Sequence, residues 1–186
     1  MTGASPARAA AVAAVAEVFR EHGYAGASLA LIGARTGLGK GSLYHLFPGG
    51  KAEMAQAVLD DVEAWFEASV FAPLRDTADP AAGLRTMMAE TRTYFRSGNR
   101  MCLVGILALT AERDPFAGKI AGYFSAWRAA LATALRGRDG SEAVEIVAEE
   151  CVAAIQGALI LSRALDEPDV FERVLSTWEQ RLLARV

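Results

Sequence analysis

The sequence predicts an all-α fold in which a small N-terminal helix-turn-helix domain precedes a larger helical body of six longer helices. Apolar residues recur at helical spacing along almost every long stretch, and no segment shows the alternation typical of a β-strand. Two short helical segments between residues 28 and 47 flank a tight turn that contains glycine. Hydrophobic residues make up 53% of the 186 residues, enough for a substantial core. About nine helices are expected.

The first 50 residues are expected to hold three short helices. Ser5-Pro6 is typical of an N-cap followed by proline in the first turn. Gly23 and Gly37 are expected to end the first and second helices, because glycine tolerates a positive φ. The three helices are predicted at residues 5–23, 28–37 and 39–47.

Six longer helices are expected to follow. Asp79-Pro80 and Asp114-Pro115 each have the pattern of a capping residue before a first-turn proline. The first is predicted to begin at Lys51 and to carry Phe66 on its apolar side, and the others are predicted at residues 80–97, 102–112, 115–135, 141–165 and 170–186. We place the domain boundary after residue 50, with a helix-turn-helix domain at 1–50 and a helical body at 51–186.

The charge distribution indicates contact with an anion at one end of the chain. The net charge is −3, but residues 1–51 hold five Lys or Arg and two Glu, so they carry +3 and the remainder carries −6. A mildly basic N-terminal part on an acidic body fits a protein that contacts an anion at one end only.

Other classes of protein fit less well. No apolar run reaches the roughly 18 residues of a membrane span, and no signal-peptide pattern opens the chain, so a cytoplasmic protein is expected. Cys102 and Cys151 lack metal-ligand spacing, so two buried or half-buried thiols and no metal or other cofactor are expected. No catalytic constellation is visible, and no enzymatic activity is expected.

The glycine-rich stretch at residues 37–42 (G-L-G-K-G-S) raises the alternative of a nucleotide loop. A P-loop requires Ser or Thr directly after Gly-Lys, whereas Gly41 follows Lys40 here. A dinucleotide loop requires a third glycine where Ser42 stands. Both loops follow a strand, and a helix is predicted before this stretch. A small nucleotide-binding enzyme using residues 37–42 is therefore only a remote alternative.

The third helix has an outward face that suits a DNA groove. A helix N-terminus favours phosphate, lysines neutralise backbone charge, and polar side chains can donate to phosphates or base edges. Taken singly, Tyr44 could be half-buried packing and Lys51 a solvated lysine. The outward residues of this helix are Lys40, Gly41, Ser42, Tyr44 and His45.

The same stretch resembles a known family. Residues 19–47 read F-x-E-H-G-Y-x-G-A-S-L-x-x-I-G-x-x-T-G-L-G-K-G-S-L-Y-H-L-F and closely resemble the DNA-binding domain of TetR-family transcriptional regulators. The continuation F-P-G-G-K at residues 47–51 is similar to one branch of that family. The resemblance covers about residues 6–60. It implies an all-helical homodimer whose helix-turn-helix binds a palindromic operator and whose body binds a small inducer.

The resemblance also assigns roles to single residues. Ser28 matches the hydroxyl that holds a phosphate at the start of the second helix, and Lys51 matches the phosphate-binding lysine of the fourth. Gly39 departs from the Ser or Thr usual at its position. A glycine cap costs only a few tenths of a kcal/mol relative to serine, so the fold should form but one DNA contact is in doubt.

The body is expected to provide a dimer interface and an effector site. In the family the last two helices form the interface, and the helix predicted at 141–165 is apolar nearly all round, so it needs cover on two sides. The alternative is a central helix of a monomer. Large apolar residues with a few polar groups are typical of a ligand site, although an ordinary core explains any single one of them more simply. The candidates are Trp65, Met88, Thr91, Arg92, Phe95, Ile106, Leu107, Phe124, Trp127 and Gln156.

These observations predict a ligand-responsive transcriptional regulator, a repressor that an apolar or aromatic effector releases from double-stranded operator DNA. The alternative is a constitutive DNA-binding regulator that has no effector.

Overall fold

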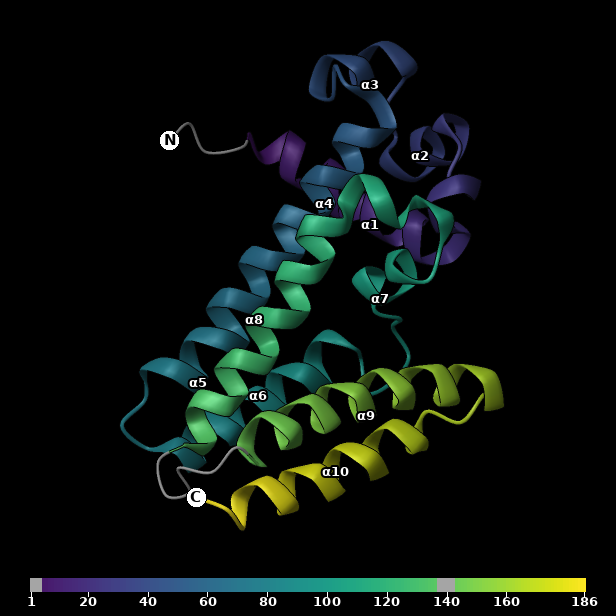
Figure 1. Cartoon of the computed structure of the whole chain (residues 1–186). Coiled ribbons are helices and arrows are strands. Elements are labelled where there is room, and N and C mark those ends of the chain that lie inside the picture. Colours follow the sequence, from purple (N-terminus) through teal and green to yellow (C-terminus); the bar gives the residue numbers. More distant parts are fainter. Residues whose placement is uncertain (1–4, 137–142) are drawn as a thin grey trace. The chain divides into compact units, whose positions relative to one another are not determined.

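The regular elements of the protein are helices throughout the part of the chain described by the computed structural model, residues 5–136 and 143–186 (Figure 1). The predicted all-α fold is confirmed. The α-helices are α1 (Pro6–Gly26), α2 (Leu29–Thr36), α3 (Lys40–Leu46), α4 (Gly50–Phe66), α5 (Ala72–Asp76), α6 (Pro80–Tyr94), α7 (Leu103–Ala108), α8 (Ala117–Leu135), α9 (Ala143–Leu165) and α10 (Asp169–Leu183).

The α4 helix continues without a break through a π-helical segment, Glu67–Phe71, into α5. The ten α-helices of the described ranges therefore amount to about nine separate rods, as expected. Neither the π-helical segment nor α5 was predicted from the sequence. Pro73 lacks an N–H and cannot donate to the carbonyl one turn earlier, and we attribute the local widening of the helix to this lost hydrogen bond.

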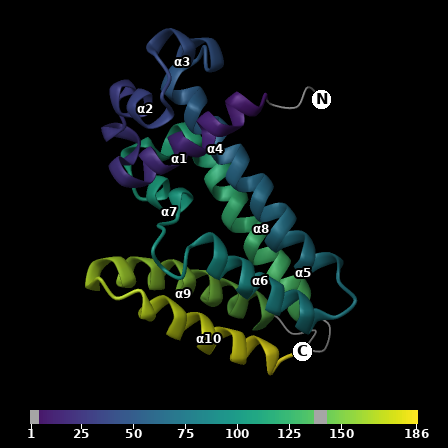
Figure 2. The same cartoon turned by 180° about the vertical axis from the view of Figure 1, so that it is seen from behind.

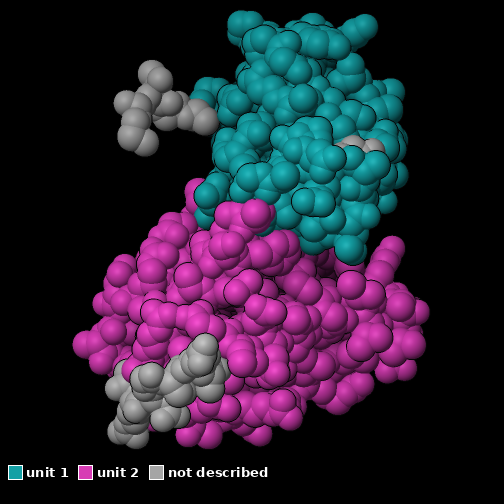
Figure 3. Space-filling model, in the orientation of Figure 1, with its two compact units in different colours: residues 1–63, 103–120 teal, residues 64–102, 121–186 magenta. Residues whose placement is uncertain are grey.

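The chain forms two compact units, which Figure 3 shows in different colours. Unit 1 contains residues 1–63 and 103–120, and unit 2 contains residues 64–102 and 121–186. Unit 1 is thus built from two separate stretches of chain, and the second stretch leaves unit 2 after Cys102 and returns to it at Ala121. The functional boundary predicted after residue 50 lies inside unit 1 and stays a prediction.

Unit 1 has its own apolar core. Side chains from α1, α2, α3 and the residue after α3 are almost completely buried there: Val15, Phe19, Ile32, Leu43 and Phe47. Burying a side chain of this size stabilises the fold by about 1.5–3 kcal/mol. The predicted stops are confirmed, because Gly23 interrupts α1 with a φ of 68° and Gly37 ends α2 with a φ of 70°.

Unit 2 is centred on the ring of Phe66. The Phe66 centroid lies 4.7 Å from that of Tyr94, 4.9 Å from Tyr123 and 5.2 Å from Trp127. The α9 and α10 helices pack side by side in both views of the chain (Figures 1 and 2). The buried Ser162 hydroxyl of α9 accepts the Phe171 N–H of α10 at 3.1 Å, which fixes this pair.

Several predicted boundaries in the body were wrong. The α6 helix ends at Tyr94 rather than near residue 97, because Arg96 and Ser97 take positive φ values of 49° and 50°. The helix predicted at 102–112 stops at Ala108, and a 3₁₀ helix, Ala111–Phe116, follows it. Pro115 therefore lies inside this 3₁₀ helix and is not the first residue of α8. The predicted start at residue 141 lies outside the described residues.

The remaining expectations concern the cysteines and the membrane. Cys102 and Cys151 are both buried and form no disulfide, as predicted. Burial raises the pKa of the Cys151 thiol to about 12, so this group stays protonated at neutral pH. Among the described residues, no helix is both long enough and apolar enough to cross a bilayer.

Candidate nucleic-acid interface and effector site

The turn between α2 and α3 is fixed by local hydrogen bonds and one close approach. Ser28 caps α2, and its Oγ accepts the Leu31 N–H at 3.2 Å. The Thr36 hydroxyl donates to the Ile32 carbonyl at 2.8 Å and accepts the Leu38 N–H at 3.2 Å. A Cβ on Gly33 would lie 3.1 Å from the Leu38 carbonyl oxygen. Sequence reasoning missed the roles of Gly33 and Thr36, although a threonine next to a helix-ending glycine is a usable signal.

The α3 helix presents the predicted DNA-binding residues on its exposed side. Leu43 is buried against the core of unit 1, and the Phe47 ring closes the same face. Gly39 is the N-cap of α3 and provides no side-chain hydrogen bond. A Cβ at Gly39 or at Gly41 would meet no atom within 4 Å, so packing does not require glycine at either position. The exposed residues of α3 include Lys40, Gly41, Ser42, Tyr44 and His45.

The cations of residues 1–51 differ in their partners. Arg20 pairs with Glu17 at 2.8 Å, and Arg35 pairs with Glu21 at 2.6 Å. Lys40 has no protein partner among the described residues and is exposed. It is therefore the cation of this set that is most available to a phosphate.

Lys51, the second residue of α4, has a structural role that the sequence did not reveal. Its Nζ donates to the Tyr24 carbonyl at 2.9 Å and to the Ala25 carbonyl at 3.4 Å. The same atom lies 4.6 Å from the centroid of the Tyr24 ring. An ammonium has three N–H donors, so one remains for a phosphate.

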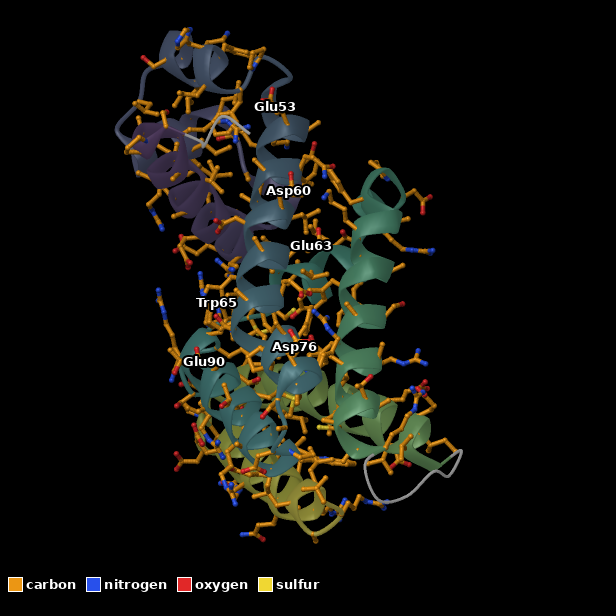
Figure 4. The ribbon with its side chains drawn as sticks, turned by 90° about the vertical axis from the view of Figure 1, so that its left-hand side faces the viewer. Glu53, Asp60, Glu63, Trp65, Asp76 and Glu90 are labelled. Carbon is orange, nitrogen blue, oxygen red and sulfur yellow. The ribbon has the colours of Figure 1, made fainter. Side chains whose placement is uncertain are left out.

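Arg8 connects the starts of α1 and α4 to the end of α3. Its guanidinium lies 4.9 Å from the Phe47 ring centroid and donates to the Leu46 carbonyl at 3.4 Å and to Glu53 at 3.3 Å. Glu53 also accepts the Gly49 N–H at 2.7 Å, and Figure 4 labels this residue on α4. Nothing in the sequence spacing predicts a contact over 45 residues.

The effector-site candidates fall into two groups. Ile106 and Leu107 of α7 belong to unit 1, and the other eight belong to unit 2. Four of these eight are completely buried, namely Met88, Thr91, Phe95 and Trp127.

Three of the aromatic candidates, Trp65, Phe95 and Trp127, lie around the ring of Phe66. Trp127 and Phe95 lie with their ring centroids 5.2 and 6.1 Å from that of Phe66. Trp65, labelled in Figure 4, is half-buried with its ring centroid 4.6 Å from that of Tyr94. Phe124 is also half-buried.

Three buried polar atoms of unit 2 have no hydrogen-bond partner among the described residues. They are Thr91 Oγ1 on α6, Trp127 Nε1 on α8 and Gln156 Nε2 on α9. Buried polar groups are paired in the large majority of cases, so three such atoms on three helices of one core need an explanation. All three residues were predicted to contact a ligand.

Arg92 does not join this group. Its Nε donates to Glu172 at 3.0 Å and its Nη2 to Glu179 at 2.8 Å, which ties α6 to α10. Burial lowers the pKa of the Arg92 guanidinium, but these two carboxylates outweigh it and the pKa is raised overall. The role that the structure gives Arg92 is to hold two helices together.

Comparison with known proteins agrees with this geometry. Residues 11–58 match the family model of bacterial regulatory proteins, tetR family, and residues 80–177 match the C-terminal domain of LmrA/YxaF-like transcriptional regulators. The HTH-type transcriptional regulator LmrA of Bacillus subtilis (strain 168) is 27% identical over 156 residues, which cover 81% of this chain and 83% of that protein. The uncharacterized HTH-type regulator YxaF of the same organism is 24% identical over 139 residues, 73% of each chain.

Solved structures show the same fold. The regulatory protein TetR from Rhodobacter sphaeroides aligns with a TM-score of 0.79 and 24% identity over 95% of this chain and 98% of its own. A cysteine mutant of the TetR-family regulator CifR, solved with 26-bp double-strand operator DNA, aligns with a TM-score of 0.70 and 23% identity over 94% of each chain.

Proposed function

This chain belongs to the TetR family of bacterial regulatory proteins and is a DNA-binding transcriptional regulator, and on that premise we propose that it is a repressor. In this proposal a homodimer binds a palindromic operator, and a small apolar or aromatic effector releases it. The observation that supports DNA reading is the exposed side of α3, opposite buried Leu43. Lys40, which has no partner within the described ranges, lies there with the polar groups of Tyr44 and His45.

Each DNA-binding residue has a proposed task. Lys40 and the third N–H of Lys51 neutralise phosphates, and the Ser28 hydroxyl can donate to a phosphate while its oxygen caps α2. Tyr44 and His45 reach phosphates or base edges. Gly39, Gly41 and Ser42 let the backbone approach the DNA closely, because no bulky side chain stands at these positions.

The dimer is proposed to form through α9 and α10. The α9 helix packs on α10 and still exposes Ile146, Ile160, Leu161 and Leu165, which are 49–61% accessible. A helix that is apolar on two sides needs a second cover, and a second copy of the chain would supply it.

Selection of DNA by the full-length protein tests this proposal. Duplexes enriched from a randomised pool are expected to carry an inverted repeat with half-site centres about 10 base pairs or a multiple apart. The mass of the complex should correspond to an even number of chains per duplex. Failure to enrich any sequence would contradict operator binding, and one chain on a single half-site would contradict the dimer.

The effector is proposed to be an aromatic compound that carries hydrogen-bond acceptors. The indole N–H of Trp127 and the amide N–H of Gln156 can only donate, and the Thr91 hydroxyl can do so too. We propose that the aromatic body contacts Trp65, Phe95 or Phe124, beside Met88. The roles of Ile106, Leu107 and Arg92 in ligand binding stay predictions from the sequence.

A matched pair of probes tests the acceptor chemistry. Acetylnaphthalene, a ketone, is expected to bind about 3- to 10-fold more tightly than ethylnaphthalene, because one neutral hydrogen bond contributes about 0.5–1.5 kcal/mol. Thermal shift across a concentration series gives the two affinities. The variant Gln156→Met should reduce the difference. The control Arg128→Met changes an exposed residue of α8 and should retain it.

Three results of this experiment would change the proposal. Equal affinities of the two probes for the wild-type protein would contradict the acceptor chemistry. No shift with either compound would favour the constitutive regulator. If the ketone binds but does not weaken the affinity for DNA, the proposed release from the operator is contradicted. A coupling free energy of about 1–3 kcal/mol between the two sites is typical of such regulation.

A further inference from the structure

Tyr24 lies at the centre of a cluster that contains Lys51. The Tyr24 residue follows the break in α1 at Gly23, and its ring is half-buried in unit 1. The ring centroid lies 5.6 Å from that of Phe19 and 5.7 Å from that of Phe116, whose plane is inclined by 70°. A third neighbour of the ring is the Lys51 ammonium, 4.6 Å from the centroid. All four residues belong to unit 1.

The Tyr24 residue holds Lys51 in two ways. Its carbonyl accepts the ammonium at 2.9 Å, and its ring attracts the same charge through a cation–π interaction. A free lysine has a flexible four-carbon stem and loses rotamer entropy whenever its charge is placed. The contact with Tyr24 removes most of that freedom before any DNA arrives.

We propose that Tyr24 is a positioning residue for DNA binding. It fixes the Lys51 ammonium at the start of α4, so that the remaining N–H meets a phosphate at little further entropic cost. This inference rests on the proposed phosphate contact of Lys51.

The Phe116 ring links this position to the second stretch of unit 1. Phe116 is the last residue of the 3₁₀ helix and is buried. Because its ring meets Tyr24 edge-on, the placement of Tyr24 depends on residues 103–120, which are joined at both ends to unit 2. A displacement of residues 103–120 would therefore move the Tyr24 ring and change its contact with the Lys51 ammonium.

The salt dependence of DNA binding tests the proposal. Full-length variants are titrated with the duplex selected by the wild-type protein at several salt concentrations. Lys51→Ala is expected to reduce the slope of log affinity against log salt by about 0.9, as expected for one lost phosphate contact. Tyr24→Leu removes the cation–π contact but keeps the backbone carbonyl, so it should give part of this reduction with about 3- to 10-fold weaker binding. Tyr24→Phe, which keeps the ring, should stay near the wild type.

A double-mutant cycle shows whether Tyr24 acts through Lys51. The double variant Tyr24→Leu/Lys51→Ala is expected to bind as Lys51→Ala does, because the two changes remove one interaction. The control Lys119→Ala removes a lysine of unit 1 that pairs with Asp60 and Glu63, which Figure 4 labels on α4, and should leave the slope unchanged. Tyr24→Met replaces Tyr24→Leu if the leucine variant loses cooperative thermal unfolding.

The possible failures are distinguishable. An unchanged slope for Lys51→Ala would overturn the phosphate contact of Lys51, while DNA binding through α3 would stand. A reduced slope for Lys51→Ala together with an unchanged slope for Tyr24→Leu, or additive losses in the cycle, would overturn the positioning role of Tyr24 alone. An unchanged slope for Phe116→Leu would overturn the link to residues 103–120.

Discussion

Tyr44→Ala is expected to weaken binding of the selected operator duplex by about 5- to 150-fold, the range for loss of a base contact of roughly 1–3 kcal/mol. The Tyr44 side chain is 43% accessible on the exposed side of α3, although it is large and aromatic. An added Cβ on Gly50 would lie only 3.7 Å from Tyr44 Cε1, so the ring lies close to the start of α4. Its phenol can donate to the DNA from a defined position. Fluorescence anisotropy with the labelled duplex measures the loss.

Two further measurements separate this effect from a general loss of structure. Light scattering should give the same mass for Tyr44→Ala and the wild type, because the proposed dimer interface lies on α9 and α10. The control Leu109→Ala changes another exposed apolar side chain of unit 1 and should leave the affinity unchanged. Wild-type affinity in Tyr44→Ala would show that α3 does not read the operator through this residue.

The variant Gly98→Ala is expected to lower the free energy of unfolding by about 2–4 kcal/mol through backbone strain and overpacking. Gly98 follows α6 with a φ of 91°, where a side chain is strained whatever the space around it. An added Cβ would lie 2.7 Å from Phe171 Cβ and 3.2 Å from the Pro168 carbonyl oxygen. Neither atom is the end of a flexible side chain, so the backbone has to move.

Gly122→Ala is the matched control for this prediction. Gly122 lies inside α8, where an added Cβ meets no atom within 4 Å. Alanine should stabilise the protein there by up to about 1 kcal/mol through helix propensity. Urea unfolding at one fixed protein concentration gives both values, since a dimer's stability depends on concentration. A change below about 0.5 kcal/mol in Gly98→Ala would contradict the strain argument.

The features that the sequence predicted correctly are those with a local cause. Ser5 and Asp79 each cap a helix within three residues of their own position, and the pattern of a polar residue before a helical stretch shows this directly. The positive φ of Gly37 follows from its place between two short helices in the same way. Such interactions depend on the nearest turn and little else.

The features that were missed depend on residues far apart in the chain. Arg8 meets Glu53 and Lys51 meets Tyr24 only after the helices have packed. The same holds for the ion pairs of Arg92 with Glu172 and Glu179 of α10. The passage of the α4 rod through Pro73 was missed for another reason, since a proline usually ends a helix.

Because unit 1 is built from two stretches of chain, its DNA-binding helices α1 to α4 cannot simply be exchanged with those of a relative. A fragment that ends at Glu63 would keep α1 to α4 but lose Phe116 and the α7 helix that packs against α1. One face of α1 and one edge of the Tyr24 ring would then meet water. A chimera with a single crossover inside α4 would take residues 1–63 from one parent and the packing residues 103–120 from the other. Recombination that keeps both parts matched needs crossovers on each side of residues 103–120 as well.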